Sequence, residues 1–145
     1  RTPLHVAAME DHDEIARYLI EHGAEINAQD GYNFIPLMFA GFKVARVLVE
    51  KGADINFLSP NGNSSSLGVA ILFGKKDVAE YLLDLGAKIP EAGTQNSFVY
   101  LQNALKIESS KYLDKYLTLG YNPLIEDELQ NTLLHYAAEG KVWIA

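Results

Sequence analysis

Four histidines and nineteen acidic residues are the side chains of this sequence that could hold a metal ion or transfer protons. His12 and His22 lack the HExxH spacing that places two imidazoles on one face of a helix. The acidic residues gather at 10–14 and 126–128, in predicted turns or loops and not in the apolar pocket that acid–base catalysis requires. We interpret both runs as solvated surface, with an acidic patch for a basic partner as the alternative. The sequence therefore predicts no metal site and no catalytic carboxylate pair.

The stretch GVAILFGKK at residues 68–76 comes nearest to a phosphate-binding loop. Its two glycines have five residues between them instead of four, and neither Ser nor Thr follows the lysine. A helix end followed by a turn is the better interpretation. The chain also contains no GxSxG, no GxGxxG and no Ser/His/Asp arrangement with a strand context. We expect a chain without enzymatic activity and without a cofactor.

The composition and charge of the chain bear on its partners. Twelve basic against nineteen acidic residues give a net charge of −7, whereas affinity for nucleic acid comes from clustered Lys and Arg. No apolar run approaches the ~18 residues that a membrane span needs. The sequence contains no cysteine, which fits a reducing compartment. We expect an intracellular chain, in the cytoplasm or the nucleus, that binds neither nucleic acid nor a membrane.

A repeat with a period of about 33 residues runs through the chain and decides the fold class. A leucine recurs with an alanine three residues after it, a spacing that places each pair on one face of a helix. These leucines are Leu4, Leu37, Leu67, Leu101 and Leu134. A second amphipathic helix follows in each repeat. Glycines stand where a left-handed cap residue should end these second helices, at Gly23, Gly52, Gly86 and Gly120. One repeat alone cannot bury its apolar face, but stacked repeats can.

The starts of the first helices follow the same logic, with two exceptions. Thr2 can cap the first helix through its hydroxyl, and Pro3 takes the first helical position, where its missing N–H costs nothing. Ser65 can cap in the same way. Ile35 and Val99 cannot, so we expect those two helix starts to be less well fixed.

The segments TPLHVAA at 2–8 and TLLHYAA at 132–138, with GAEIN at 23–27 and GADIN at 52–56, resemble the ankyrin repeat. The resemblance covers essentially the whole chain. It implies an all-α solenoid of stacked helix–turn–helix units with projecting hairpin-like loops, as a single domain over residues 1–145. The repeats are expected at about 1–30, 31–59, 60–93, 94–126 and 127–145, the last of them partial.

Both ends of the sequence look cut. Arg1 stands directly before a helix cap, and Ile144-Ala145 align with Ile15-Ala16 in the middle of a helix. Because a solenoid exposes apolar surface unless its terminal repeats have a polar outer face, we expect a longer parent protein.

The resemblance also assigns roles to single residues. His5 and His135 hold the fourth place of the ankyrin tetrapeptide, where the imidazole ties the loop to the helix start. Asn27 and Asn56 stand at a spacing that resembles the ankyrin substrates of asparaginyl hydroxylase, so both are candidates for hydroxylation. The alternative is that each asparagine shapes its loop through side-chain-to-backbone hydrogen bonds.

Binding in this family generally uses the loop tips and the exposed ends of the first helices, which line a concave groove. Mapped onto this chain, that surface comprises Met9, Tyr32, Phe34, Phe57, Leu58, Leu72, Phe73, Phe98, Ile107 and Leu129. Aromatic anchors within a polar rim are the usual energetic centre of a protein interface. The alternative is that the loop aromatics pack onto the neighbouring loop as local core.

We therefore expect a monomeric, non-catalytic module that binds another protein through this surface. One alternative is a scaffold or targeting segment of a larger multidomain enzyme or host-directed effector, whose catalytic part lies outside residues 1–145. Another is a groove for a small molecule or nucleotide, which the acidic balance disfavours for an anionic ligand.

The second repeat is four residues shorter than the first. IPLMFAG runs to the place of Ala8 and FKVARVL resumes at the place of Asp13, so the counterparts of residues 9–12 are missing. Two antiparallel helices need at least ~2 connecting residues. We therefore predict that Gly41 and Phe42 are not bonded and that residues between them are missing. The alternative is a true deletion that distorts the repeat.

Overall fold

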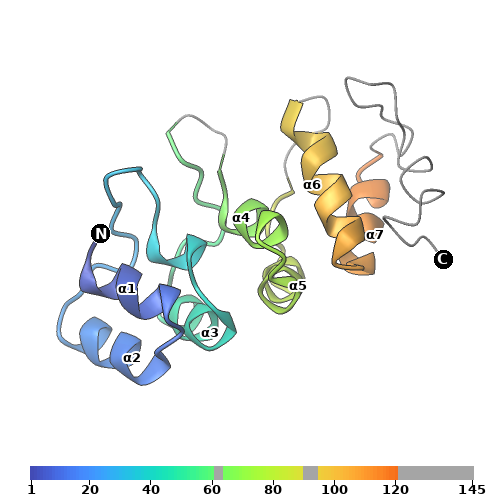
Figure 1. The fold of residues 1–145 in the computed structure, drawn as a ribbon. Coiled ribbons are helices and arrows are strands. Elements are labelled where there is room, and N and C mark those ends of the chain that lie inside the picture. The colour runs from blue at the N-terminus through green and yellow to red at the C-terminus, as the bar shows by residue number, and fades with distance from the viewer. Residues whose placement is uncertain (61–63, 90–94, 121–145) are drawn as a thin grey trace. The chain divides into compact units, whose positions relative to one another are not determined.

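Helices form the regular structure of the chain (Figure 1). The structure is a computed structural model that describes residues 1–60, 64–89 and 95–120, apart from the side chains of 95–98. In order, the elements are α1 (Pro3–Met9), α2 (Asp13–Glu21), the 3-10 turn η1 (Pro36–Met38), α3 (Phe42–Glu50), α4 (Ser66–Leu72), α5 (Lys76–Asp84), α6 (Gln95–Lys106) and α7 (Ser110–Thr118). Within these described ranges, no helix is both long and apolar enough to cross a membrane.

The chain divides into two compact units, which we call the N-terminal half (Arg1–Ala70) and the C-terminal half (Ile71–Ala145). In the N-terminal half, α1 packs on α2 and η1, and α3 packs on α2, α1 and η1. In the C-terminal half, α7 packs on α6 and α5. The loops that follow α2 and α3 both leave the helices on the same side (Figure 1). These are the helix–turn–helix repeats of the predicted all-α solenoid.

The second helices of the four repeats have the same length and the same kind of end. Each of α2, α3, α5 and α7 has nine residues. The glycines that follow these helices have φ between +82° and +96°. In repeat 2, the next amide, Ala53 N, reaches back to Leu48 O at 2.8 Å. The predicted left-handed glycine caps are confirmed.

Gly52→Ala tests one of these caps. A Cβ at Gly52 would meet nothing within 4 Å, so its cost is that of the backbone conformation alone, φ +96°. We expect the free energy of unfolding to fall by about 1 kcal/mol, because alanine avoids positive φ. Urea unfolding followed by circular dichroism measures this loss. Gly52→Asn should lose less, since asparagine tolerates left-handed conformations better; equal losses for both variants would contradict the explanation.

The buried core comes from the positions that define the repeat. Leu4, Leu37, Leu67 and Leu101 are at most 1% exposed, and the alanines paired with them are at most 3% exposed. The fifth pair lies outside the described residues. Second helices add fully buried residues such as Leu48. Small alanines on the first helices let neighbouring helices approach closely, and the larger side chains fill the space between them.

Repeat 2 keeps its second helix but not its first. α3 begins at Phe42, the place that Asp13 has at the start of α2. Ahead of it the chain forms only the short turn η1, which starts at Ile35 without a side-chain cap. At the junction Gly41 is the N-cap of α3, and its carbonyl oxygen accepts a hydrogen bond from Ala45 N at 2.9 Å. The structure thus describes repeat 2 in its shortened form, and the absence of residues between Gly41 and Phe42 stays a prediction.

Asp11 in the turn of repeat 1 supplies a cap for the second helix of repeat 2. Its Oδ1 accepts a hydrogen bond at 2.9 Å from Val44 N, in the first turn of α3. A Cβ built on Gly41 would lie 2.5 Å from Cγ of Asp11, so the carboxylate occupies the space that a side chain at position 41 would need. In repeat 4 the equivalent amide, Tyr112 N, is capped at 3.4 Å by Ser109 of the same repeat. Repeat 2 therefore takes its helix cap from its neighbour.

Two other helix starts agree with the sequence prediction. Thr2 is the N-cap of α1 with Pro3 in the first turn, and the Thr2 hydroxyl contacts the His5 imidazole at 2.9 Å. Ser65 Oγ accepts a hydrogen bond from Gly68 N at 3.0 Å, ahead of α4.

The start of α6 differs from the sequence prediction. The first helix of repeat 4 was expected to start at Val99, but α6 begins at Gln95, so Val99 is a residue of the helix interior. Phe98, expected in a loop, is therefore part of α6. Between residues 95 and 98 the sequence has no glycine or proline to stop the helix from extending backwards.

Candidate functional site

The loop after α2 is built around a buried carboxylate. Asp30 Oδ1 accepts hydrogen bonds from Tyr32 N at 2.9 Å and from Phe34 N at 3.0 Å. Asp30 N donates to Phe34 O at 2.9 Å, and Asn33, inside the turn, has a φ of +61°. Asparagine is among the residues that adopt such a φ most readily. One side chain thus holds the tip of this loop in a single conformation.

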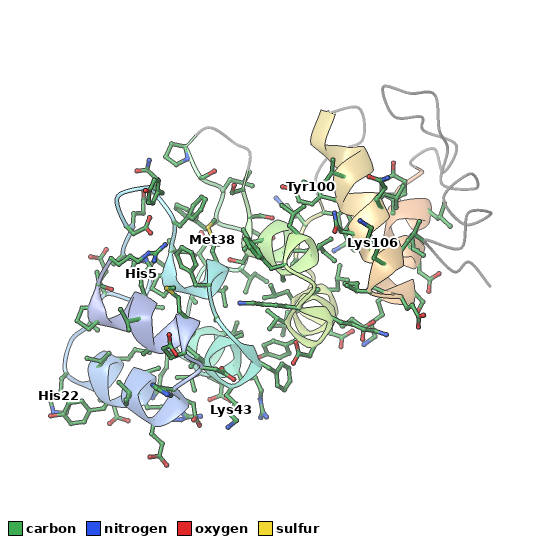
Figure 2. All side chains as sticks on the ribbon, in the orientation of Figure 1. His5, His22, Met38, Lys43, Tyr100 and Lys106 are labelled. Carbon is green, nitrogen blue, oxygen red and sulfur yellow. The ribbon has the colours of Figure 1, made fainter. Side chains whose placement is uncertain are left out.

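His5 joins the same loop to the start of α1. Thr2 N donates to Nδ1 of His5 at 3.1 Å, so the ring proton is assigned to Nε2. Nε2 then donates to Phe34 O at 2.8 Å. Figure 2 shows His5 beneath the loop, while His22 lies at the exposed end of α2, where its Nδ1 contacts Tyr18 O at 2.8 Å. The role that the resemblance implied for His5 is confirmed; His135 lies outside the described residues.

Arg1 completes the surroundings of Asp30. Its Nε lies 3.5 Å from Asp30 Oδ2, an oxygen to which no described residue donates a hydrogen bond, and its guanidinium lies 5.0 Å from the centre of the Phe39 ring. Burial acts to raise the pKa of Asp30, but the amides of Phe34 and Tyr32, together with His5 and Arg1, hold this pKa below its ordinary value of 3.8. The carboxylate therefore stays ionised at neutral pH, where it can accept its two amide hydrogen bonds.

The turn gives different surroundings to the two aromatic residues that were predicted for the binding surface: one ring is exposed and the other is partly buried. Tyr32 is 75% exposed. Phe34 is partly buried, and its ring centre lies 5.8 Å from that of Phe39, which in turn lies 6.0 Å from the His5 ring. The local-core alternative therefore describes Phe34, whereas Tyr32 presents its ring to solvent from a fixed backbone.

The loop after α3 is closed like a hairpin. Leu58 and Ser65 form an antiparallel bridge, and Ser59 N donates to Ser64 O at 2.9 Å. Leu58 is 57% exposed, while Phe57 before it is partly buried. Of these two predicted residues, Leu58 is the more accessible to a partner protein.

Four more residues of the predicted surface lie at the ends of the first helices or in the turns that follow them. Met9 at the end of α1 and Leu72 at the end of α4 are 43% and 41% exposed, and Phe73 is 75% exposed. Ile107 is partly buried, and its Cγ2 would lie 3.9 Å from a Cβ built on Gly74. Within the C-terminal half, the turns of repeats 3 and 4 are therefore neighbours. The side chain of Phe98 and all of Leu129 lie outside the described residues.

The two asparagines predicted as modification sites lie in successive loops. Asn27 Oδ1 accepts a hydrogen bond from Asp54 N at 3.0 Å, which links the loop of repeat 1 to that of repeat 2. Asp54 Oδ1 accepts from Asn56 N at 3.0 Å. Asn27 thus has the structural role that was weighed against modification. Hydroxylation of either residue stays a prediction.

Sequence reasoning missed the two aspartates that organise this region, Asp30 and Asp11. For Asp30 a signal was present, because Asp30-Gly31 is a turn dipeptide. For Asp11 there was none, since its partner, Val44 N, belongs to another repeat. In the part of the chain that the structure describes, no three His, Asp or Glu side chains form a group that could hold a metal ion.

Stacked helix pairs with left-handed glycine caps and hairpin-like loops define the class of helical repeat proteins. Residues 1–59 match the family model described as ankyrin repeats (3 copies). The crystal structure of the human ASB11 ankyrin repeat domain matches with a TM-score of 0.70 and 24% identity, over 91% of this chain and 60% of that chain, a likeness that shows the fold alone. Residues 1–59 thus match the ankyrin repeat family, and the fold of the chain is that of an ankyrin repeat protein.

Two curated proteins share short segments with the chain. One is alpha-latrocrustotoxin-Lt1a of Latrodectus tredecimguttatus, 48% identical over 42 residues, which are 29% of this chain and 3% of that protein. The other is transient receptor potential cation channel subfamily A member 1 of Drosophila melanogaster, 51% identical over 39 residues, which are 27% of this chain and 3% of that protein. Each match thus spans only a small part of the relative. Ankyrin repeats are generally protein–protein interaction modules, and their fold is typically non-catalytic.

Proposed function

We propose that this chain is a non-catalytic module that binds a partner protein through its loop tips and the ends of its first helices, inside the cell. The observation that carries the proposal is the presentation of Tyr32. Its ring is 75% exposed, yet Asp30 and His5 fix the backbone on which it stands. An exposed aromatic side chain that is already ordered loses little entropy on binding, which favours it as an anchor.

Two other exposed apolar residues, one in each half of the chain, support binding through loops and turns. Leu58 stands on a loop closed by the bridge to Ser65, and Phe73 stands in the turn after α4. Loop and turn residues are usually polar, so large apolar side chains at these places are informative. We leave Phe34 out of the proposed surface, because its ring packs on Phe39.

Site-specific photo-cross-linking tests the proposal. A benzophenone amino acid is placed at position 32, 58 or 73, and for comparison at position 117, where Leu117 is 50% exposed on the second helix α7. In an extract of the source cells we expect adducts with one protein from the first three positions and not from position 117. Adducts at position 117 alone would contradict the proposed surface.

Tyr32→Ala then tests the anchor itself against the partner identified in this way. We expect the dissociation constant to rise at least about tenfold, as for a hot-spot aromatic residue. Circular dichroism should stay unchanged, because the Tyr32 ring is outside the core. Leu117→Ala is the matched control and should leave the dissociation constant unaltered. Equal affinity for the wild type and Tyr32→Ala would remove Tyr32 from the interface.

A further inference from the structure

The negative charge of the N-terminal half is unevenly distributed. With histidine counted as neutral, α2, α3 and the adjoining Lys51 hold four acidic and four basic side chains. The remaining residues of this half form its loops, first helices and turns, and they hold five acidic side chains and one basic side chain, Arg1. The second helices are thus balanced. The loops, first helices and turns, which present Tyr32 and Leu58, carry all of the net negative charge.

Two exposed carboxylates lie in the loops themselves. Glu25 follows α2 and Asp54 follows α3, and both residues are exposed. The hydrogen bond from Asp54 N to Asn27 joins the two loops. Among the described residues, no lysine or arginine pairs with either carboxylate. Their charges therefore remain available to a cation that approaches from solvent.

Asp30 places a further negative charge next to the backbone of Tyr32. Its Oδ1 accepts the hydrogen bond from Tyr32 N at 2.9 Å, and its lowered pKa keeps the carboxyl ionised at neutral pH. The side chain of Asp30 is 0% exposed, yet its Oδ2 accepts no hydrogen bond from any described residue. One ion pair, with Arg1 at 3.5 Å, offsets this charge. Because a buried charge is screened less than an exposed one, the tip of the loop has a negative potential.

The surroundings of Asp30 show how this region holds a guanidinium. Arg1 pairs with Asp30, and its Cζ lies 5.0 Å from the centre of the Phe39 ring. A carboxylate and an aromatic ring thus act together on one cation. Tyr32 offers a second aromatic ring next to the same carboxylate. This ring is 75% exposed, and no described cation lies over it.

We propose that the partner bound by these loops presents a basic segment, with an arginine over the ring of Tyr32. This assignment rests on the proposed function, since it gives the chemistry of the partner at the same surface. Charge complementarity selects the occupant, because Glu25 and Asp54 attract a basic segment and repel an acidic one. Arginine is favoured over lysine at the ring, since its planar guanidinium is less strongly hydrated and stacks on aromatic faces.

A titration with synthetic peptides tests the chemistry of this surface. The probes are a peptide of alternating arginine and glycine and one of alternating glutamate and glycine, added to the isotope-labelled 145-residue chain. We expect the arginine peptide to shift the NMR signals of Tyr32 and of nearby loop amides in a saturable way, and the glutamate peptide to shift none. A rise in NaCl from about 20 to about 300 mM should weaken binding at least about fivefold. No saturable shift with the arginine peptide, or equal shifts with both peptides, overturns the proposal.

Two double variants of equal charge show where the arginine peptide binds. Glu25→Gln with Asp54→Asn neutralises two exposed carboxylates in the loops, and Glu14→Gln with Glu21→Gln neutralises two on α2. The loop variant should raise the dissociation constant of the arginine peptide at least about threefold, and the helix variant by less than about 1.5-fold. Equal losses in the two variants would mean that the overall charge alone attracts the peptide, and they would overturn the proposal.

Substitutions of Tyr32 test the role of its ring. Tyr32→Phe keeps an aromatic face and should keep the dissociation constant of the arginine peptide within about twofold. Tyr32→Leu keeps an apolar side chain without that face and should raise the dissociation constant about threefold. Both variants should fold, because the ring is outside the core. An unchanged affinity in Tyr32→Leu would remove the arginine from the ring and overturn the proposal.

The cellular partner separates this inference from the proposed function. Photo-cross-links from position 32 are formed in the cell extract at low and at high salt. We expect high salt to suppress the adducts, as it does for a basic partner on an anionic surface. Adducts that form equally at both salt concentrations overturn the basic partner and leave the proposed function standing. A lack of adducts at either concentration counts against the proposed function alone, since the peptide titration judges the surface without it.

Discussion

Replacing Gly41 by alanine should lower the free energy of unfolding by about 2–3 kcal/mol, although the backbone at this residue is open to any amino acid. Its φ of −72° and ψ of 175° are extended values. The cost comes from space: a Cβ at position 41 would lie 2.5 Å from Cγ and 2.7 Å from Oδ1 of Asp11. The carboxylate would have to move, and Val44 N would lose its cap. Urea unfolding followed by circular dichroism measures the loss.

A double-mutant cycle makes this explanation specific. In an Asp11→Gly background the carboxylate is absent, and Gly at position 11 tolerates the φ of +54° found there. Gly41→Ala should then cost almost nothing, so the two changes should be strongly non-additive. Gly31→Ala is the matched control, because a Cβ at Gly31 would meet nothing within 4 Å. Additive losses for the pair would mean that the Asp11 contact does not account for the effect.

Removing the Asp30 carboxylate should have the second large effect. Asp30→Ala leaves two backbone amides, those of Tyr32 and Phe34, without their acceptor in a loop whose aspartate side chain is fully buried. We expect a loss of about 2–3 kcal/mol in the free energy of unfolding at pH 7. Asp30→Asn keeps an acceptor oxygen and should lose less. Amide exchange at residues 32 and 34 should become faster in the alanine variant.

The effect of Asp30 should depend on pH with a defined sign. The folded pKa lies below the ordinary 3.8, so the stabilising contribution is complete above that value and is lost as the pH falls through the folded pKa. Between pH 5 and pH 2 the wild type should therefore lose more stability than Asp30→Asn. Asp54→Ala, which removes an exposed carboxylate that accepts the Asn56 amide, is the control and should change this slope little. Parallel pH curves for the wild type and Asp30→Asn would contradict the assignment.

The sequence predicted the positions of the repeats correctly, because the residues that define each repeat lie close together in the chain. Each second helix has its apolar spacing and its glycine within one stretch of chain, and the predicted caps at Gly23, Gly52, Gly86 and Gly120 have the expected positive φ. The first helices were less predictable, because their bounds depend on what stands at their start. Val99 has no capping side chain, so the helix runs back to Gln95.

The sequence predicted the candidate site only in part, because the exposure of a side chain depends on its tertiary contacts. Tyr32 and Phe34 are two residues apart in one loop, and both are aromatic. Only the packing of Phe34 on Phe39, a residue whose position is set by the shortened repeat, separates core from surface here. The junction at Gly41 shows the same limit. The sequence did not show that the helix after this junction takes its cap from Asp11, 33 positions away from the amide that it caps.

That shared cap has a consequence for how the chain unfolds. In a linear array each repeat usually contributes its own stability plus a contact term with its neighbour, so end repeats can fray alone. Here the order of α3 depends on a side chain that is held in place by the turn after α1. Melting of repeat 1 therefore also uncaps repeat 2, and the first two repeats should open together as one cooperative segment. The short second repeat, which takes its cap from Asp11, thus makes repeats 1 and 2 less able to open one at a time.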